Sequence, residues 1–418
     1  MKHIKTLSII VALAAQTAFA APKLASKYPV DIPPDATSTI YHAELLHLNS
    51  LGFNNLFNSS SYVQQAIVLG KRNLDWLKFM NEGRPEGSKI TISKPGQLPR
   101  YPIDKPNHYS PATIERDYKE IASKIPAVMK AVLYDSKDFT KEPGLPIAEY
   151  EKWAKAVDKL YQISARWNLL SPDIGWYSRN RANDVRGYYY LSKEENLESK
   201  LTNWSKLAPE EQQRLSGYLT NLCYNTVPND ATCAANLKRA IARGQVAAFY
   251  NQYNPNSKQV WDDHFVLEGV RSDFEWTHNN DNLTTVPFRA TTSKVEDYLK
   301  TNIEDEWRWN NWQLRLNFTD DAAIHVEFVP GATPHVGGLN GDTITMDDNA
   351  PLTEWDVQWT IRHEFGHVVG FPDCYIEFYD TQAQEMVNYQ LDITDLMCSR
   401  AGKLQAHHYE EMRKKYLK

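Results

Sequence analysis

The chain has 418 residues, of which 42% are hydrophobic and 23% charged. This is the composition of a folded protein, so wholesale disorder is excluded, and the length predicts two or three domains. The 46 Lys and Arg against 52 Asp and Glu give a net charge of −6, so charge does not indicate a nucleic-acid partner. No apolar run reaches the roughly 18–20 residues of a membrane span.

The N-terminus has the three parts of a secretory signal peptide. Lys2, His3 and Lys5 form a basic region, a short apolar core runs over 7–15, and Ala18-Phe19-Ala20 offers small residues for cleavage. We therefore expect residues 1–20 to be removed and the mature protein to be secreted or periplasmic. The proline-containing segment 21–38 is interpreted as a linker or leader.

The cysteines point to disulfides, because an even number in an exported chain favours pairing over free thiols. There are four of them, so three pairings are formally possible. We favour the local pairs Cys223–Cys233 and Cys374–Cys398, since each would lie within one supersecondary unit.

Residues 39–282 are predicted to form a mostly helical domain, to which the sequence assigns no role. Helical apolar spacing covers 39–82, 112–135 with an interruption at Pro126, and 147–168. A proline-rich loop is predicted over 83–111. Pro209 with two following acids starts a helix over 209–224, and another helix begins near 230.

The pattern changes near residue 283. Strands are expected over 285–289, 312–318, 324–329 and 342–346, with a helix from Ser293 to about Trp309 and a long helix over about 353–369. The predicted class is therefore α+β: a mostly helical N-terminal domain, followed over 283–418 by an α/β domain with a mixed, twisted sheet.

The long helix contains His363-Glu364-Phe365-Gly366-His367. Histidines four residues apart lie on one helix face and can bind one ion, and the intervening Glu can reach a metal-bound water. Gly370 lies where the helix must stop, and a left-handed glycine there would return Asp373 towards the histidines. Three protein ligands and one open position define a catalytic zinc site.

The motif His-Glu-x-x-His-x-x-Gly-x-x-Asp resembles that of metzincin zinc endopeptidases, in its snapalysin-like form. Gly370-Phe371 is also similar to astacins, Met397 in Asp395-Leu396-Met397-Cys398 resembles the methionine turn, and residues 341–348 resemble the last matrixin strand before the active-site helix. The resemblance covers about 283–418. It implies a zinc metalloendopeptidase with a metzincin-like fold that acts on protein or peptide substrates, binds one catalytic Zn²⁺ and uses Glu364 as general base.

Several expectations accompany this resemblance. The residue two positions after Met397 is Ser399, where astacins have a Tyr, so a transition-state Tyr is unassigned. A disulfide between Cys374 and Cys398 would join the third ligand to the methionine turn. Substrate is expected to extend along an edge strand within 336–340. The helical domain is hypothesised to cover the cleft as latency segments do.

Alternatives remain open at this point. Glu385, in a stretch with helical character, is a rival third ligand as in thermolysin-like enzymes, and Cys374 is a possible fourth ligand that would close the site. Met397 is otherwise a plain core residue, and His407 and His408 are expected to be exposed. Rival functions are a cell-wall amide hydrolase and a non-catalytic binding protein with a degenerate protease domain. Oligomeric state is not predicted.

Overall fold

The computed structural model describes residues 61–85, 88–92, 100–330, 332, 334–348, 352 and 355–418. The predicted signal peptide and the segment 21–38 lie outside these residues. Helices and mixed sheets make up the described chain, which agrees with the α+β prediction at that level. None of the described helices is long and apolar enough to cross a membrane.

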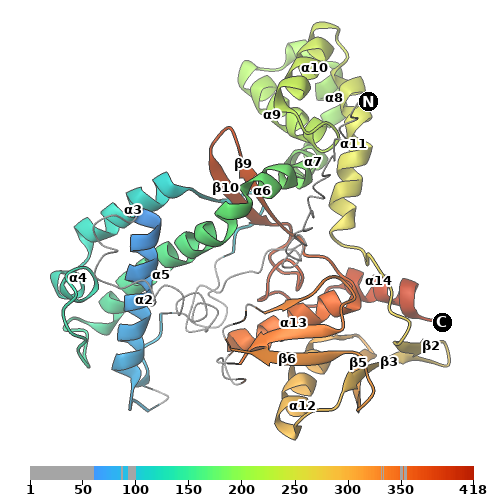
Figure 1. Ribbon diagram of the computed structural model, residues 1–418. Helices are drawn as coiled ribbons and strands as arrows, with labels where there is room; N and C mark the ends of the chain where they lie inside the picture. Colours follow the sequence, from blue (N-terminus) through green and yellow to red (C-terminus); the bar gives the residue numbers. More distant parts are fainter. Residues whose placement is uncertain are drawn as a thin grey trace, which may run out of the picture.

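The first group of helices surrounds its own hydrophobic core, at one end of the molecule in Figure 1. Ser110 and Thr113 form a capping box, and Pro111 occupies the first turn, so one helix starts there. The next helix starts after Pro126, as predicted. The helices of this group are α2 (Tyr62–Asn81), α3 (Pro111–Lys124), α4 (Ala127–Leu133) and α5 (Ile147–Leu170).

A second helical group has a separate core and contains the predicted disulfide Cys223–Cys233. This bridge joins α9 to α10, both of which begin where the sequence predicted. The α-helices between α5 and the sheets are α6 (Ile174–Asn180), whose Tyr177 still belongs to the first core, and α7 (Arg186–Ser192), α8 (Leu197–Thr202), α9 (Pro209–Tyr224), α10 (Asp230–Ala242) and α11 (Val246–Asp263). Short 3₁₀ turns occupy 171–173, 181–183 and 204–206.

Two mixed sheets follow in the C-terminal part. The first has the order β2-β3-β5-β4, with β3 and β5 parallel, and the second has the order β6-β8-β7, with β6 and β8 parallel. Their bounds are β2 (Glu275–Thr277), β3 (Asn280–Arg289), β4 (Arg308–Trp309), β5 (Trp312–Thr319), β6 (His325–Val329), β7 (His335–Val336) and β8 (Thr343–Asp347). The amide of Arg289 donates to Ile324 O, which links the two sheets.

Three helices accompany these sheets: α12 (Ser293–Leu299), α13 (Trp355–Val369) and α14 (Ala406–Tyr416). The helix expected over 293–309 is shorter than predicted. It continues from α12 through a π-helical turn, Lys300–Glu304, and the chain then pairs as β4 with β5. A strand forms in place of the end of the predicted helix because Trp307 and Trp312 are buried in the core of the sheet.

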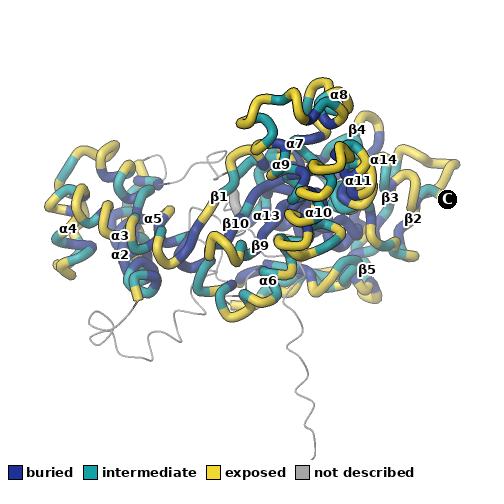
Figure 2. Tube along the Cα trace, turned by 90° about the horizontal axis from the view of Figure 1, so that it is seen from above, coloured by how far each residue is buried: buried dark blue, intermediate teal, exposed yellow. Residues whose placement is uncertain are grey.

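A third sheet connects the helical and C-terminal parts. Strand β1 (Asn107–Tyr109), from the predicted loop, pairs with β10 (Glu385–Gln390), which pairs with β9 (Tyr375–Asp380). The prediction of helical structure around Glu385 was therefore wrong. Within this hairpin Met386 joins the first helical core, whereas Val387 joins the C-terminal core. Figure 2 shows buried segments of β9, β10 and α13 near one another in the middle of the molecule.

Candidate metal centre

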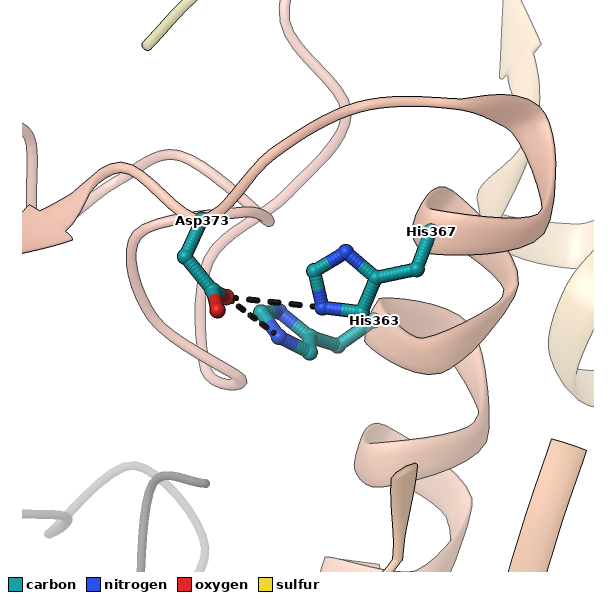
Figure 3. A group of neighbouring side chains, drawn as sticks. All are labelled: His363, His367 and Asp373. Carbon is teal, nitrogen blue, oxygen red and sulfur yellow. Dashed lines mark ion pairs between the residues drawn. The ribbon is translucent and has the colours of Figure 1, made fainter. Parts of the chain in front are cut away.

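The two histidines of α13 and Asp373 converge in a buried position (Figure 3). One carboxylate oxygen of Asp373, Oδ1, lies 3.0 Å from His363 Nε2 and 3.5 Å from His367 Nε2. All three residues are at most 6% exposed. The structure therefore brings together the three residues that the sequence proposed as ligands.

The turn after α13 depends on Gly370, as expected. Its φ is +109°, a conformation that residues with a Cβ rarely adopt. A Cβ on Gly370 would also lie 2.6 Å from Asn340 Oδ1 and 2.8 Å from Gly269 O. The Gly370 and Phe371 amides donate to Gly366 O, which closes the helix end. This reversal carries the chain back to Asp373.

Hydrogen bonds to the other ring nitrogens orient both imidazoles. His363 Nδ1 lies 2.9 Å from Leu396 O, and His367 Nδ1 lies 2.8 Å from Phe371 O. A carbonyl oxygen only accepts hydrogen bonds, so each Nδ1 carries a proton. In the neutral ring, Nε2 then has the lone pair and can act as an acceptor. Both Nε2 atoms then face a carboxylate whose oxygens make no hydrogen bond of normal geometry. Three acceptors that converge in this way match a cation site.

The electrostatics of this cluster follow from the same contacts. Burial lowers the pKa of His367, but the adjacent Asp373 carboxylate outweighs burial and raises that pKa to about 9. His363 behaves in the same way, with its pKa raised. Burial raises the pKa of Asp373, yet the two imidazoles lower it overall. The carboxylate is thus favoured in its ionised form, which is the form that binds a metal, whereas each imidazole would release its Nε2 proton on binding one.

The predicted methionine turn, Asp395–Cys398, lies against α13 at Gly366, between the two histidines. A Cβ on Gly366 would come within 2.2 Å of Met397 Sδ, so a larger residue there would displace the Met397 side chain. Met397 is 1% exposed. The Cys374–Cys398 disulfide, also as predicted, joins the residue after Asp373 to the residue after Met397.

Glu364, the expected general base, lies on α13 beside His363 and is 4% exposed. Its negative charge contributes to the raised pKa of both histidines, which places the carboxylate within electrostatic range of both rings. The position suits proton transfer at a metal-bound water.

The rival ligands are elsewhere or chemically occupied. Glu385 is on β10, where its Oε1 lies 2.6 Å from His108 Nδ1. Cys374 is part of a disulfide, so it offers no thiolate. The expectation that His407 and His408 are exposed was wrong, because α14 packs on the C-terminal core: His408 is 1% exposed and His407 is half-buried.

Some contacts of the site were not predictable from residue type. Leu396 and Phe371 act through backbone carbonyls, which have no side-chain signature. His264, just after α11, lies with Nδ1 3.1 Å from Asp373 O, and the Asn340 amide donates to His367 O. His264 belongs to the predicted helical domain, so that region contacts the ligand segment directly.

Comparison with known proteins supplies no relative: no family model, curated protein or solved structure matches this chain.

Proposed function

We propose that the protein is an exported zinc-dependent metallopeptidase, most simply an endopeptidase, with a metzincin-like catalytic part. The observation that carries the proposal is the convergence of His363 Nε2, His367 Nε2 and an Asp373 oxygen, all of them buried and, with neutral imidazoles, all of them acceptors. Two neutral imidazoles and one carboxylate are a frequent donor set for catalytic zinc. The Nδ1–H bonds to carbonyls are the outer contacts that orient such ligands.

His363, His367 and Asp373 would hold the ion. A bound zinc ion acidifies water and polarises a carbonyl group. Glu364 would accept a proton from the attacking water at its carboxylate and return that proton to the nitrogen of the leaving amine. Burial of Glu364 beside His363 supports this role, since the carboxylate is screened little by solvent.

One edge of the second sheet is where an extended substrate would add as a further strand. Among the described strands, β7 pairs only with β8, so its other edge is unpaired by strands. Of the predicted segment 336–340, only Val336 lies in a strand, and the chain bends after it. A peptide that adds beside His335–Val336 would run close to the end of α13, because the Asn340 amide donates to His367 O.

The test is metal content and peptide cleavage by the purified mature chain, compared across three variants. We expect stoichiometric zinc and casein cleavage in the wild type, and zinc without cleavage in Glu364→Gln. Asp373→Ala should lose both, whereas Glu385→Gln is a control that should keep both.

Zinc retained in Asp373→Ala but lost in Glu385→Gln would instead support the thermolysin-like ligand set. Release of fragments from cell-wall material without casein cleavage would indicate an amide hydrolase. Bound metal without cleavage of either substrate would indicate a binding protein.

A further inference from the structure

A buried carboxylate outside the ligand set organises the methionine turn. Asp395 is 0% exposed, and its Oδ1 accepts a hydrogen bond from the Met397 amide at 2.7 Å. This bond closes the turn through the side chain of its first residue. The Leu396 amide donates to Lys403 O, which anchors the turn from its other side.

Helix α14 holds the same carboxylate through two neighbouring histidines. His407 Nε2 lies 3.1 Å from Oδ2, and His408 Nε2 lies 3.4 Å from Oδ1. The contact of His407 with Oδ2 is a close approach of charges and not a hydrogen bond, and the two histidines together offset part of the free-energy cost of burying the Asp395 carboxylate. Its pKa is lowered overall: burial raises it, and the two histidines outweigh burial.

Asp395, His407 and His408 also have the spacing of a metal site, but their hydrogen bonding argues against one. The Gln405 amide donates to His408 Nδ1 at 2.9 Å, so that nitrogen carries the lone pair. The proton of neutral His408 is therefore on Nε2, directed at Asp395. Burial lowers the pKa of His408, which favours this neutral form. His408 is thus a donor to Asp395.

This turn also orients one of the proposed ligands, His363. Leu396 O, between Asp395 and Met397, receives the Nδ1–H of His363. Movement of the Asp395 side chain would displace this carbonyl and the Met397 side chain that packs on Gly366. The chain of contacts runs from α14 through Asp395 and Leu396 to His363.

We propose that Asp395, held by His407 and His408, is a positioning residue for the metal centre, acting through the Leu396 carbonyl on the His363 ring. This inference rests on the proposed function in assigning a metal to the site. Contacts of this outer kind change metal affinity by roughly 10- to 100-fold when they are removed.

The experiment titrates the metal-free protein with Co²⁺ and records its visible spectrum, which reports ligand geometry without any need for turnover. We expect Asp395→Ala to weaken Co²⁺ binding roughly 10- to 100-fold and to alter the spectrum. Asp395→Asn keeps the Oδ1 acceptor, so it should rescue part of the loss.

Asp184→Ala is the matched control. Asp184 is also buried, and its Oδ1 likewise accepts from the amide two residues later, that of Arg186. It should lower the unfolding temperature while leaving Co²⁺ affinity unchanged. The inference is overturned if folded Asp395→Ala binds Co²⁺ like the wild type, or if Asp184→Ala weakens binding equally.

The outcome for the proposed function is separate. A wild type that binds Co²⁺ but hydrolyses nothing refutes the peptidase assignment and leaves the positioning test intact. If the wild type binds no Co²⁺, NMR of the metal-free protein with labelled histidine decides: a protected Nδ1–H of His363 in the wild type that is lost in Asp395→Ala supports the role. An unchanged signal contradicts it.

Discussion

Arg166 on α5 and Glu377 on β9 form a buried ion pair between the helical part and the strand that follows the third proposed ligand. Arg166 Nε donates to Glu377 Oε1 at 3.1 Å, and Nη2 donates to the other oxygen. Tyr109 on β1 donates to Oε1 as well. The pair, at most 8% exposed, links two segments that are 211 residues apart in sequence.

Removing one partner should strongly destabilise the protein. Arg166→Met leaves the Glu377 carboxylate buried and unpaired, so we expect a loss of about 3–5 kcal/mol in the free energy of unfolding. The double variant Arg166→Met with Glu377→Gln removes the charge and should lose less. Urea denaturation followed by circular dichroism measures both.

The exposed pair Lys119–Glu115 on α3 is the control, and Lys119→Met should leave the denaturation midpoint unchanged. A double variant less stable than Arg166→Met would contradict the argument.

The helical part should be required for the metal centre. Without residues 1–263, β10 loses its partner β1, Glu377 loses Arg166, and His264, which contacts Asp373 O, loses the helix α11 that precedes it. We expect the fragment 264–418 to be poorly soluble and unable to bind zinc. A folded fragment with higher peptidase activity than the whole chain would instead support the latency hypothesis.

Gly370→Ala should impair metal binding more than a glycine substitution in a similar backbone conformation elsewhere. The alanine combines positive φ with a Cβ that meets Asn340 and Gly269, so stability should fall by about 1–3 kcal/mol and zinc affinity should fall as well. Gly83 has φ of +81° with nothing within 4 Å of its Cβ, so Gly83→Ala isolates the backbone effect. Competition with a chromogenic chelator measures zinc affinity; equal affinities in the two variants would refute the prediction.

The two disulfides should differ in their effect on metal binding. Cys374–Cys398 closes a sequence separation of 24 and Cys223–Cys233 one of 10, so their effects on unfolded-chain entropy differ by less than about 1 kcal/mol. Only the first joins the Asp373 segment to the methionine turn. Replacing Cys374 and Cys398 by Ser should accelerate zinc release, measured by stopped-flow chelation. The corresponding Cys223 and Cys233 variant should release zinc at the wild-type rate.

The pKa of Asp184 predicts that the stability of the protein depends on pH. Burial raises its pKa, but Arg186 and Tyr389 outweigh burial and lower it below the ordinary value. A group whose folded pKa is lowered contributes stability above its unfolded pKa, near 4, and that contribution is lost as pH falls through the folded value. Urea midpoints of the wild type and Asp184→Asn should therefore differ at pH 7 and converge towards pH 3. A constant difference would contradict this linkage.

The sequence determined the local features of the site. The four-residue spacing of His363 and His367 needs only a helix, and Gly370 marks its end because few other residues reverse the chain there. Local proximity also decided the disulfides, since both pairs lie within short separations. The helix starts at Pro111 and Pro209 follow from capping and proline geometry in the same way.

Only the tertiary structure decided how the distant parts meet. The pairing of strand β1 with β10 and the ion pair of Arg166 with Glu377 join residues more than 200 apart in sequence, for which short-range periodicity has no signal. The carbonyls of Leu396 and Phe371 orient the imidazoles regardless of their side chains. Residue types were therefore enough to predict His363, His367 and Asp373 as the three ligands, whereas the tertiary structure supplied the contacts that orient their side chains towards one point.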